Sequence, residues 1–238
     1  MSMSDFVFEP VRISSLPVNG SDARFPIARV FCLGRNYPWG DSLNAAREVP
    51  AFFMKPATSV IDASGELVFP TQTEQFCHEI ELVIAIGKDG FEISEEQALG
   101  HVWGYAAGLD LTRRDLQMAA KAVGNPWEQA KAFDGSAPIT PIQPVSLVGH
   151  PRQGAIWLSV NGVERQRSDL ESQIWSVSEI ISQLSHSVSL RAGDLIMTGT
   201  PPGVAALEAG DVINGGISGI GEFDVRVGSR RADRPTQN

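Results

Sequence analysis

The sequence predicts a mixed α+β protein, mainly β, with a rolled or barrel-like β core and short helices. Three observations support this fold class. The chain has 238 residues, of which 42% are hydrophobic, so it can bury a sizeable core. Short apolar runs recur between glycine-containing turns, a spacing that favours a rolled sheet over a parallel one. Helix-start signatures at Ser94, Thr112 and Ser176 predict short helices between the strands.

The charge balance and the cysteine count exclude several functional classes. The chain has 28 acidic and 19 basic residues and a net charge of −9, which disfavours nucleic acid as a partner. Its two cysteines, Cys32 and Cys77, indicate neither a disulfide framework nor a zinc site. Residues 1–10 lack a signal-peptide pattern, and no apolar run approaches the length of a membrane span. We therefore expect a cytoplasmic protein with no membrane partner.

The first part of the chain predicts a few short strands and one loop of interest. Residues 1–28 are dotted with proline and serine and read as irregular or edge structure, with a turn at Asn19-Gly20. Residues 38–48 are too broken by small and polar residues for a helix, so we interpret them as a mobile loop or lid. Strands are expected at 29–33, 51–54 and 59–61.

The rest of the chain alternates short strands with three helices. Asn161-Gly162 joins two apolar runs and is the strongest short-range signal for a hairpin, here over 155–167. Residues 229–238 are polar and are expected to be disordered. Strands are predicted over 77–87, 101–110, 192–196 and 209–213. Helices are predicted to begin after Ser94 and to span 113–123 and 177–186.

Two carboxylates interrupt the buried strand expected over 77–87. Alternate residues of a strand share a face, so Glu79 and Glu81 point to the same side. The opposite face carries the isoleucines and leucine at 80, 82, 84 and 86. Two like charges on one buried face repel unless a cation lies between them, and a divalent metal ion is the simplest candidate. The alternative is an exposed strand face with solvated glutamates.

A third carboxylate and a polar helix face are expected nearby. Asp110 ends the strand over 101–110, and the following helix carries Arg114, Gln117 and Lys121 on one face. An all-oxygen ligand set of Glu79, Glu81 and Asp110 favours hard cations such as Mg²⁺, Mn²⁺ or Ca²⁺. Three carboxylates carry excess charge for one divalent ion, which Lys131 or Arg114 would offset while holding an anionic substrate. The alternative is an ion-pair network without function.

Two further segments have candidate roles. The segment from Thr198 to Gly203 is either a tight turn or a loop that presents the Gly199 backbone N–H and the Thr200 hydroxyl to a substrate oxyanion. By alternation, His78 faces away from the two glutamates, so we interpret it as structural. No phosphate-binding loop or dinucleotide fingerprint is present.

Taken together, these motifs resemble the fumarylacetoacetate hydrolase family, and among its members the bacterial fumarylpyruvate hydrolase-like enzymes. The resemblance covers most of the chain and rests on six ordered motifs. These are Gly34-Arg35-Asn36-Tyr37, Phe53-Met54-Lys55-Pro56, His78-Glu79-Ile80-Glu81-Leu82, the run from Gly108 to Gln117, Ala130-Lys131-Ala132-Phe133, and the run from Thr198 to Val204.

The resemblance implies a role for each candidate residue. It implies that Glu79, Glu81 and Asp110 bind Mg²⁺ or Mn²⁺, with Lys131 beside the metal. It further implies a set of groups that contact a small oxo-acid substrate. These are Arg114 and Thr200, which with Lys131 form the expected catalytic set, and Arg35, Tyr37, Gln117 and Gly199, which form the expected substrate-binding set.

The resemblance also implies an architecture and an activity. The expected fold is a β-roll core with a small N-terminal lobe, usually dimeric. The expected divisions are a lobe with the lid segment over 1–70, a β-roll catalytic domain over 71–228 and a disordered tail over 229–238. The expected activity is metal-dependent hydrolysis of a C–C bond in a 2,4-dioxo acid, an acylpyruvate such as fumarylpyruvate, in aromatic compound catabolism.

One departure from the family pattern leaves alternatives open. Hydrolytic members carry a histidine shortly after the Gly-Arg-Asn-Tyr motif and a glutamate three residues later, whereas this chain has Gly40 and Leu43. Asp41 or Glu48 would have to replace the missing base. Two other hypotheses follow: an oxo-acid decarboxylase, tautomerase or isomerase that uses the same metal site, and a non-catalytic protein that binds a metal and an oxo acid.

Overall fold

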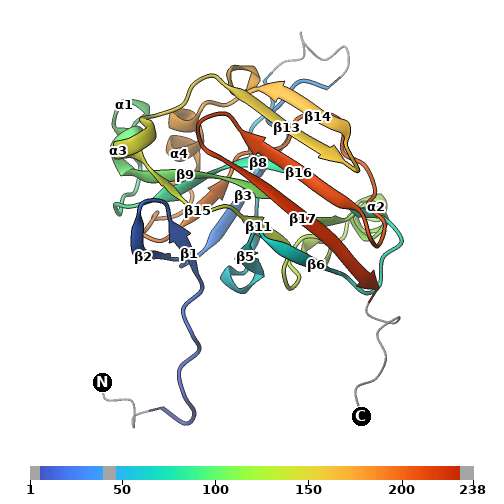
Figure 1. The fold of residues 1–238 in the computed structure, drawn as a ribbon. Coiled ribbons are helices and arrows are strands. Elements are labelled where there is room, and N and C mark those ends of the chain that lie inside the picture. The colour runs from blue at the N-terminus through green and yellow to red at the C-terminus, as the bar shows by residue number, and fades with distance from the viewer. Residues whose placement is uncertain (1–5, 40–46, 231–238) are drawn as a thin grey trace.

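The computed structural model describes residues 6–39 and 47–230, and it is mainly β. Two large sheets lie against each other and curl into a half-barrel, with short helices at their margins (Figure 1). This arrangement confirms the rolled β core that the sequence predicts. Within the described residues, no helix is long and apolar enough to cross a membrane. The α-helices are α1 (Glu95–Ala98), α2 (Arg114–Ala122), α3 (Val145–Val148) and α4 (Val177–Ser185).

The larger sheet has eight strands and holds Glu81 in β8 (Ile80–Ile86), whereas Glu79 directly precedes this strand and Asp110 directly follows β9 (Val102–Leu109). Strand β8 lies at its centre, antiparallel to both neighbours, β15 and β9. The sheet order is β4 (Ala51–Lys55), β3 (Val30–Gly34), β15 (Leu195–Met197), β8 (Ile80–Ile86), β9 (Val102–Leu109), β11 (Ala137–Ile139) and β5 (Val60–Asp62), with β12 (Gln143–Pro144) paired to β9.

The smaller sheet has five strands and covers one face of β8. It contains the predicted hairpin, in which Asn161 and Gly162 have φ of 52° and 75° and close the turn between β13 and β14. These positive φ values explain the Asn-Gly pair. The sheet order is β14 (Val163–Asp169), β13 (Ala155–Val160), β16 (Val212–Ile217), β17 (Gly221–Arg230) and β6 (Gly65–Phe69).

Alternation along β8 separates the core from the site, as expected. The even-numbered residues 80, 82, 84 and 86 belong to the main apolar cluster, which includes Ile156 and Val225 of the smaller sheet. The odd-numbered Val83 and Ala85 belong to a second cluster with Val30 of β3 on the other face. Glu79 and Glu81 share this second face, so they are directed away from the smaller sheet.

The predicted helices occur, but only one has the predicted cap. Helix α4 has a complete capping box between Ser176 and Glu179. Helix α2 begins at Arg114, so Arg113 and not Thr112 is its N-cap residue. The Thr112 hydroxyl lies within donating distance of the Asp110 carbonyl, at 3.0 Å, and of Glu79, at 3.2 Å. Ser94 precedes the short helix α1 without a side-chain cap to its backbone.

The structure corrects two expectations and decides a third. Residues 15–26, expected to be irregular or edge structure, form a two-stranded sheet of β1 (Ser15–Val18) and β2 (Ser21–Pro26) around the predicted turn, in agreement with the edge-structure alternative. The strand expected over 77–87 is broken: β7 (Phe76–Cys77) pairs with β10 (Thr112–Arg113), and β8 begins only at Ile80. Ser229 and Arg230, assigned to the tail, belong to β17 because Arg230 pairs with Phe69 of β6.

The strand pairings also bear on the expected N-terminal lobe. Strands β3, β4 and β5 belong to the eight-stranded sheet, and β6 pairs with β17. The described strands between residues 30 and 69 are therefore joined to the later strands by backbone hydrogen bonds on both sheets. The division of the chain at residue 70 stays a prediction about folding units.

Candidate active site

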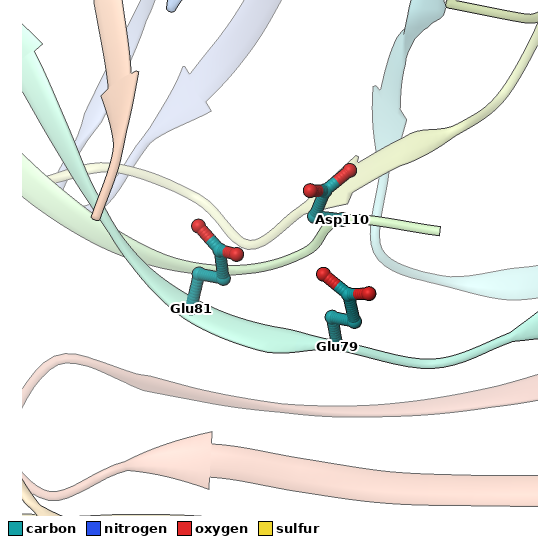
Figure 2. A group of neighbouring side chains, drawn as sticks. All are labelled: Glu79, Glu81 and Asp110. Carbon is teal, nitrogen blue, oxygen red and sulfur yellow. The ribbon is translucent and has the colours of Figure 1, made fainter. Parts of the chain in front are cut away.

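Three buried carboxylates meet at the ends of β8 and β9. Figure 2 shows the side chains of Glu79, Glu81 and Asp110 turned toward one another. Their ligand atoms all lie within 4.8 Å of one another, and the three residues are 7%, 2% and 1% exposed. The backbone supports this meeting, because the Asp110 N–H donates to the Glu79 carbonyl at 2.8 Å. The solvated strand face considered from the sequence is therefore wrong.

Two buried lysines offset the negative charge. The Lys131 ammonium donates to Glu79 at 2.8 Å and to Asp110 at 2.5 Å. The Lys55 ammonium lies 2.9 Å from the other Asp110 oxygen. Since burial of an unpaired charge is costly, these pairs make the carboxylate cluster stable enough to form. The expectation that Lys131 lies beside the carboxylates agrees with this geometry.

Sequence reasoning missed Lys55 as a member of the site. Its side chain is fully buried and also donates to the Ser136 hydroxyl at 3.0 Å and to the backbone carbonyls of Leu111 and Lys131. The chain offered one signal, a lysine at the end of the apolar run Phe52-Phe53-Met54. A charged residue that ends a buried strand requires a partner, but the sequence alone does not identify Asp110 as that partner.

The pKa values of the cluster follow from burial and from these pairs. Burial, together with the nearby Asp110 and Glu79 charges, raises the pKa of Glu81 well above its usual value. Burial alone would raise the pKa of Asp110, but Lys131 and Lys55 outweigh it and lower that pKa. Burial opposes the charge on Lys131, but Asp110 and Glu79 outweigh it and raise the lysine pKa. Glu81 is thus the carboxylate that gains most from an added cation.

The donor set fits a divalent metal ion. Its three potential ligands are all carboxylates, which suit hard cations such as Mg²⁺ and Mn²⁺. Among the described residues, no histidine or cysteine belongs to this group, so a softer metal has no preferred ligand here. Glu79, Glu81 and Asp110 would hold the ion, and the two lysines would remain as neighbouring positive charges.

Helix α2 brings Arg114 of the expected catalytic set and Gln117 of the expected substrate-binding set to the cluster. The Arg114 guanidinium lies 3.9 Å from Glu79 and donates to the Gln117 side chain at 3.0 Å. The Arg114 side chain is 36% exposed, so it faces the approach to the site, whereas Gln117 is 4% exposed. The shared helix face predicted from the spacing of these two residues is confirmed.

The polar groups of Gly199 and Thr200 are already bonded within the protein. The Gly199 N–H donates to Glu81 at 2.8 Å. The Thr200 hydroxyl donates to the Ile80 carbonyl at 2.8 Å. Both bonds fix the loop from Thr198 to Gly203 against β8, between the two glutamates. Their first structural effect is therefore to orient Glu81, and a substrate contact of either group stays a prediction.

Gln166 is a second residue that sequence reasoning missed. It is fully buried on β14, and its amide nitrogen donates to the Thr200 hydroxyl at 2.8 Å and to the Pro201 carbonyl at 2.7 Å. Its amide oxygen lies 2.8 Å from His78 Nδ1 and accepts from the Ile80 N–H at 3.3 Å. Gln166 thus ties the smaller sheet to the strand and the loop of the site. His78 is structural, as expected.

The loop approaches β14 so closely that one of its positions requires glycine. Gly203 has φ of 105°, and a Cβ atom there would lie 1.9 Å from the Arg165 carbonyl oxygen. No side chain fits this gap. The glycine therefore brings the loop within hydrogen-bonding range of Gln166.

We expect Gln166→Leu to lower the free energy of unfolding by about 2–4 kcal/mol, because it leaves several buried polar groups without a partner. Chemical denaturation with EDTA present measures this change. Gln153→Leu, at an exposed glutamine, is the matched control and should change stability by about 0.5 kcal/mol or less. Equal effects of the two substitutions would contradict the role assigned to this network.

The Gly-Arg-Asn-Tyr loop has one exposed and two buried side chains. The Arg35 side chain is 83% exposed and lies 3.8 Å from Glu48. Tyr37 is buried, and its burial raises the pKa of the phenol. Asn36 is fully buried and is bonded through its side chain to the backbone of Trp175 and to the Thr198 carbonyl. Substrate contacts of Arg35 and Tyr37 stay predictions.

The expected lid lies partly outside the described residues. Positions 40–46, including Gly40, Asp41 and Leu43, are not described, but the residue that follows them is anchored. The Arg47 guanidinium donates to Glu179 at 2.7 Å and lies 3.6 Å from the centre of the Trp175 ring. These contacts attach Arg47 to helix α4 and to Trp175, which precedes that helix.

This anchor should weaken in acid. Hydrogen bonding to Arg47 lowers the pKa of Glu179 to about 2. A carboxyl group with a lowered folded-state pKa stabilises the fold above its unfolded pKa of about 4.3, and the effect is lost as pH falls through about 2. We therefore compare the free energy of unfolding of the wild type with that of Glu179→Gln. The difference between the two should shrink as the pH falls over this range, by less than about 1 kcal/mol because the pair is partly exposed. Denaturation of both proteins from pH 5 to 2 tests this, and a difference independent of pH would contradict it.

The fold and this site define a family. Residues 29–228 match the family described as fumarylacetoacetate hydrolase, C-terminal, and the chain belongs to that family. The match includes all five charged residues of the cluster. The family membership expected from the six sequence motifs is thus confirmed, and with it the assignment of the chain as an enzyme.

Particular relatives are also similar over nearly their whole length. A fumarylpyruvate hydrolase from Ralstonia sp is 43% identical over 79% of this chain and 98% of its own. The crystal structure of fumarylpyruvate hydrolase from Pseudomonas aeruginosa in complex with Mn²⁺ and pyruvate is 52% identical, with a TM-score of 0.90, and covers 94% of this chain and 99% of that one. A mitochondrial oxaloacetate tautomerase from Arabidopsis thaliana is 37% identical over 83% of this chain and 90% of its own.

Proposed function

We propose that this protein is a metal-dependent hydrolase that cleaves a C–C bond in a 2,4-dioxo acid, with fumarylpyruvate as the substrate. The observation that carries the proposal is the buried cluster of Glu79, Glu81 and Asp110 with Lys131 bonded to two of its members. The fumarylpyruvate hydrolases similar to this chain, one of them crystallised with Mn²⁺ and pyruvate, support it.

In this reaction water adds to the acyl carbon of the substrate. The bond between that carbon and the methylene carbon of the pyruvoyl group breaks, and the products are a carboxylic acid and pyruvate. When bound at Glu79, Glu81 and Asp110, Mg²⁺ or Mn²⁺ supplies Lewis acidity to the pyruvoyl oxygens. Electron density moves onto the departing pyruvate as its enolate, which takes up a proton to give pyruvate.

Residues of the chain stabilise the developing charge and orient the substrate. Lys131, 2.8 Å from Glu79, keeps a positive charge beside the developing enolate. Arg114, at the partly exposed edge of the site, binds a substrate carboxylate with the geometry that suits a guanidinium, and Gln117 holds Arg114 in place. Thr200 and Gly199 orient the substrate through the loop that they fix.

The residue that activates water is either Asp41 or Glu48. Gly40 and Leu43 occupy the positions of the family's histidine and glutamate, and neither has an acid or base group. Glu48 is exposed and lies beside Arg35. A positioned general base contributes about 10²–10⁴ in rate, so the substitution of whichever residue serves lowers kcat by that factor.

A second candidate function is tautomerisation or isomerisation of a similar oxo acid. The missing histidine and glutamate favour it, because a proton shift needs no activated water. The oxaloacetate tautomerase at 37% identity also supports it. Decarboxylation of an oxo acid is a related alternative at the same metal site.

The deciding experiment combines absorbance and NMR. The enol absorbance of fumarylpyruvate is followed with Mg²⁺ or Mn²⁺ and with EDTA, and the products are identified by NMR. Fumarate and pyruvate in equal amounts mean hydrolysis. Shifted double bonds, faster enol–keto exchange of oxaloacetate, or released CO₂ mean the second function. Metal-dependent binding of oxalate without turnover of any substrate would overturn both and leave a non-catalytic binding protein.

Two expectations about the protein's setting stay predictions. The homodimer is measured by light scattering after size exclusion, and a cytoplasmic location by fractionation of the native host.

A further inference from the structure

The segment before β1 exposes an unusual number of apolar side chains. Residues 6–13, which we call the arm, include five apolar residues that are at least half exposed: Phe6, Val7, Phe8, Val11 and Ile13 at 51%, 96%, 72%, 84% and 73%. Figure 1 shows the arm leading away from the two sheets. So much apolar surface in eight consecutive residues favours burial against another surface.

The arm has no partner within its own chain. Among the described residues, none forms a hydrogen bond or an ion pair with residues 6–13, and neither apolar cluster contains an arm residue. The first hydrogen bond to the rest of the described chain follows the arm, where the Ser14 carbonyl accepts from the Ile27 N–H at 2.8 Å. The eight arm residues and Ser14 reach at most about 30 Å when extended, which is enough to cross to a neighbouring molecule.

A groove of about 610 Å³ offers a complementary surface on the same molecule. It lies where the larger sheet ends at β5 and the smaller sheet ends at β6, so both strands have one free edge. Its apolar lining is Ile61, Val68, Phe69, Pro70 and Phe133. Val68 is 48% exposed, which is unusual for a strand valine beside a cavity. Free strand edges and apolar pockets together suit an extended apolar peptide.

The root of the arm lies on the same face as the groove. Strand β1 packs beside β5, and Arg24 of the β1–β2 hairpin lies 3.6 Å from Asp62 of β5. When a projecting segment and its receptor share one face, two copies related by a two-fold axis exchange segments reciprocally and the assembly closes as a dimer. A second copy of this chain therefore satisfies both surfaces at once.

Charge argues against an anionic membrane or a nucleic acid as the surface that the arm contacts. The chain carries a net charge of −9, and the arm contains Glu9 and only one basic residue, Arg12. An acidic protein with a single basic residue in the segment is repelled by anionic lipid headgroups and by nucleic acid. The remaining surface that accepts apolar side chains is a protein groove.

We propose that the arm, residues 6–13, packs into the β5–β6 groove of a second copy of this chain, so that two copies exchange arms in a dimer. The contact is apolar, with Phe6, Phe8 and Val11 as anchors. It places the partner's arm beside Phe133, two residues from Lys131, and so supports the loop that holds this lysine.

Oligomeric state tests the proposal without reference to activity. Light scattering should give twice the chain mass of 25.6 kDa for the full chain, and deletion of residues 1–13 should raise the dimer dissociation constant by roughly 100-fold or more. Phe8→Asp and Val68→Asp should each weaken the dimer roughly 10-fold or more. Val163→Asp is the matched control, because Val163 is 53% exposed but lies in the β13–β14 hairpin, and it should leave the dimer unchanged.

Cross-linking separates arm exchange from folding back. A chain with Phe8→Cys is mixed with a chain with Val68→Cys and oxidised. A disulfide-linked pair that forms in the mixture and in neither variant alone supports exchange. A full-length monomer, a truncated chain that dimerises as tightly as the full chain, or a link formed only within a single chain that carries both cysteines would overturn the proposal. Unchanged circular dichroism and melting temperature confirm that each variant is folded.

Discussion

We expect Glu81→Gln to abolish metal-dependent turnover while leaving the fold intact. Glu81 is 2% exposed, and it is the cluster member whose pKa is raised most clearly by burial and by its two carboxylate neighbours. Glutamine keeps the shape and still accepts the Gly199 hydrogen bond, but it removes the charge that a divalent ion requires. We expect turnover to fall by about 10³-fold or more, in keeping with the several kcal/mol that a bound metal supplies.

The measurement pairs turnover of fumarylpyruvate with calorimetry of Mn²⁺ binding, and metal affinity should fall with activity. Glu208→Gln, at an exposed glutamate, is the matched control and should change neither. If Glu81→Gln kept both its metal affinity and its activity, the ligand set proposed here would be wrong. If it kept affinity but lost activity, Glu81 would act on the substrate rather than on the metal.

We expect Lys55→Met to be the most destabilising single substitution at the site. The lysine side chain is fully buried, and its ammonium lies 2.9 Å from Asp110, which is itself 1% exposed. Methionine fills a similar volume but leaves Asp110 with only Lys131 as a cationic partner. The loss of one partner of a buried ion pair costs about 3–5 kcal/mol, so the free energy of unfolding in EDTA should fall by that amount.

Lys88→Met provides the control, because Lys88 is exposed and the same loss of charge should cost about 0.5 kcal/mol or less. Chemical denaturation of the three proteins with EDTA gives the comparison. A loss below about 1 kcal/mol for Lys55→Met would show that the metal-free cluster does not depend on this lysine for its stability.

Local signals in the sequence predicted much of the fold and the ligand set. The two-residue alternation predicted that Glu79, directly before β8, and Glu81, within it, point to one side, and the two side chains meet in the carboxylate cluster. The Asn-Gly turn of the β13–β14 hairpin and the capping box of α4 were likewise predicted, since each is set by residues at most a few positions apart.

Contacts between distant residues were not predictable in the same way. Lys55 meets Asp110 and Gln166 meets Thr200 across 55 and 34 positions of sequence. Nothing near Gln166 distinguishes it from an exposed glutamine on a hairpin. The sequence left residues 15–26 open between irregular and edge structure, because Pro17 and Pro26 are compatible with both, and only the structure shows that they lie in paired strands.

The contacts around Trp175 have a consequence for how relatives diverge. The Asn36 side chain bonds to the backbone of Trp175, and the Arg47 guanidinium lies over the Trp175 ring. The residues on either side of positions 37–46 therefore both contact Trp175. With its ends fixed, a loop can change in length at an entropic cost that grows only slowly. Because Tyr37 is buried in the main apolar cluster, we expect the nine positions from 38 to 46 to be the exchangeable cassette. A graft that restores the family's histidine and glutamate in this cassette would install a new water-activating pair without repacking the metal site.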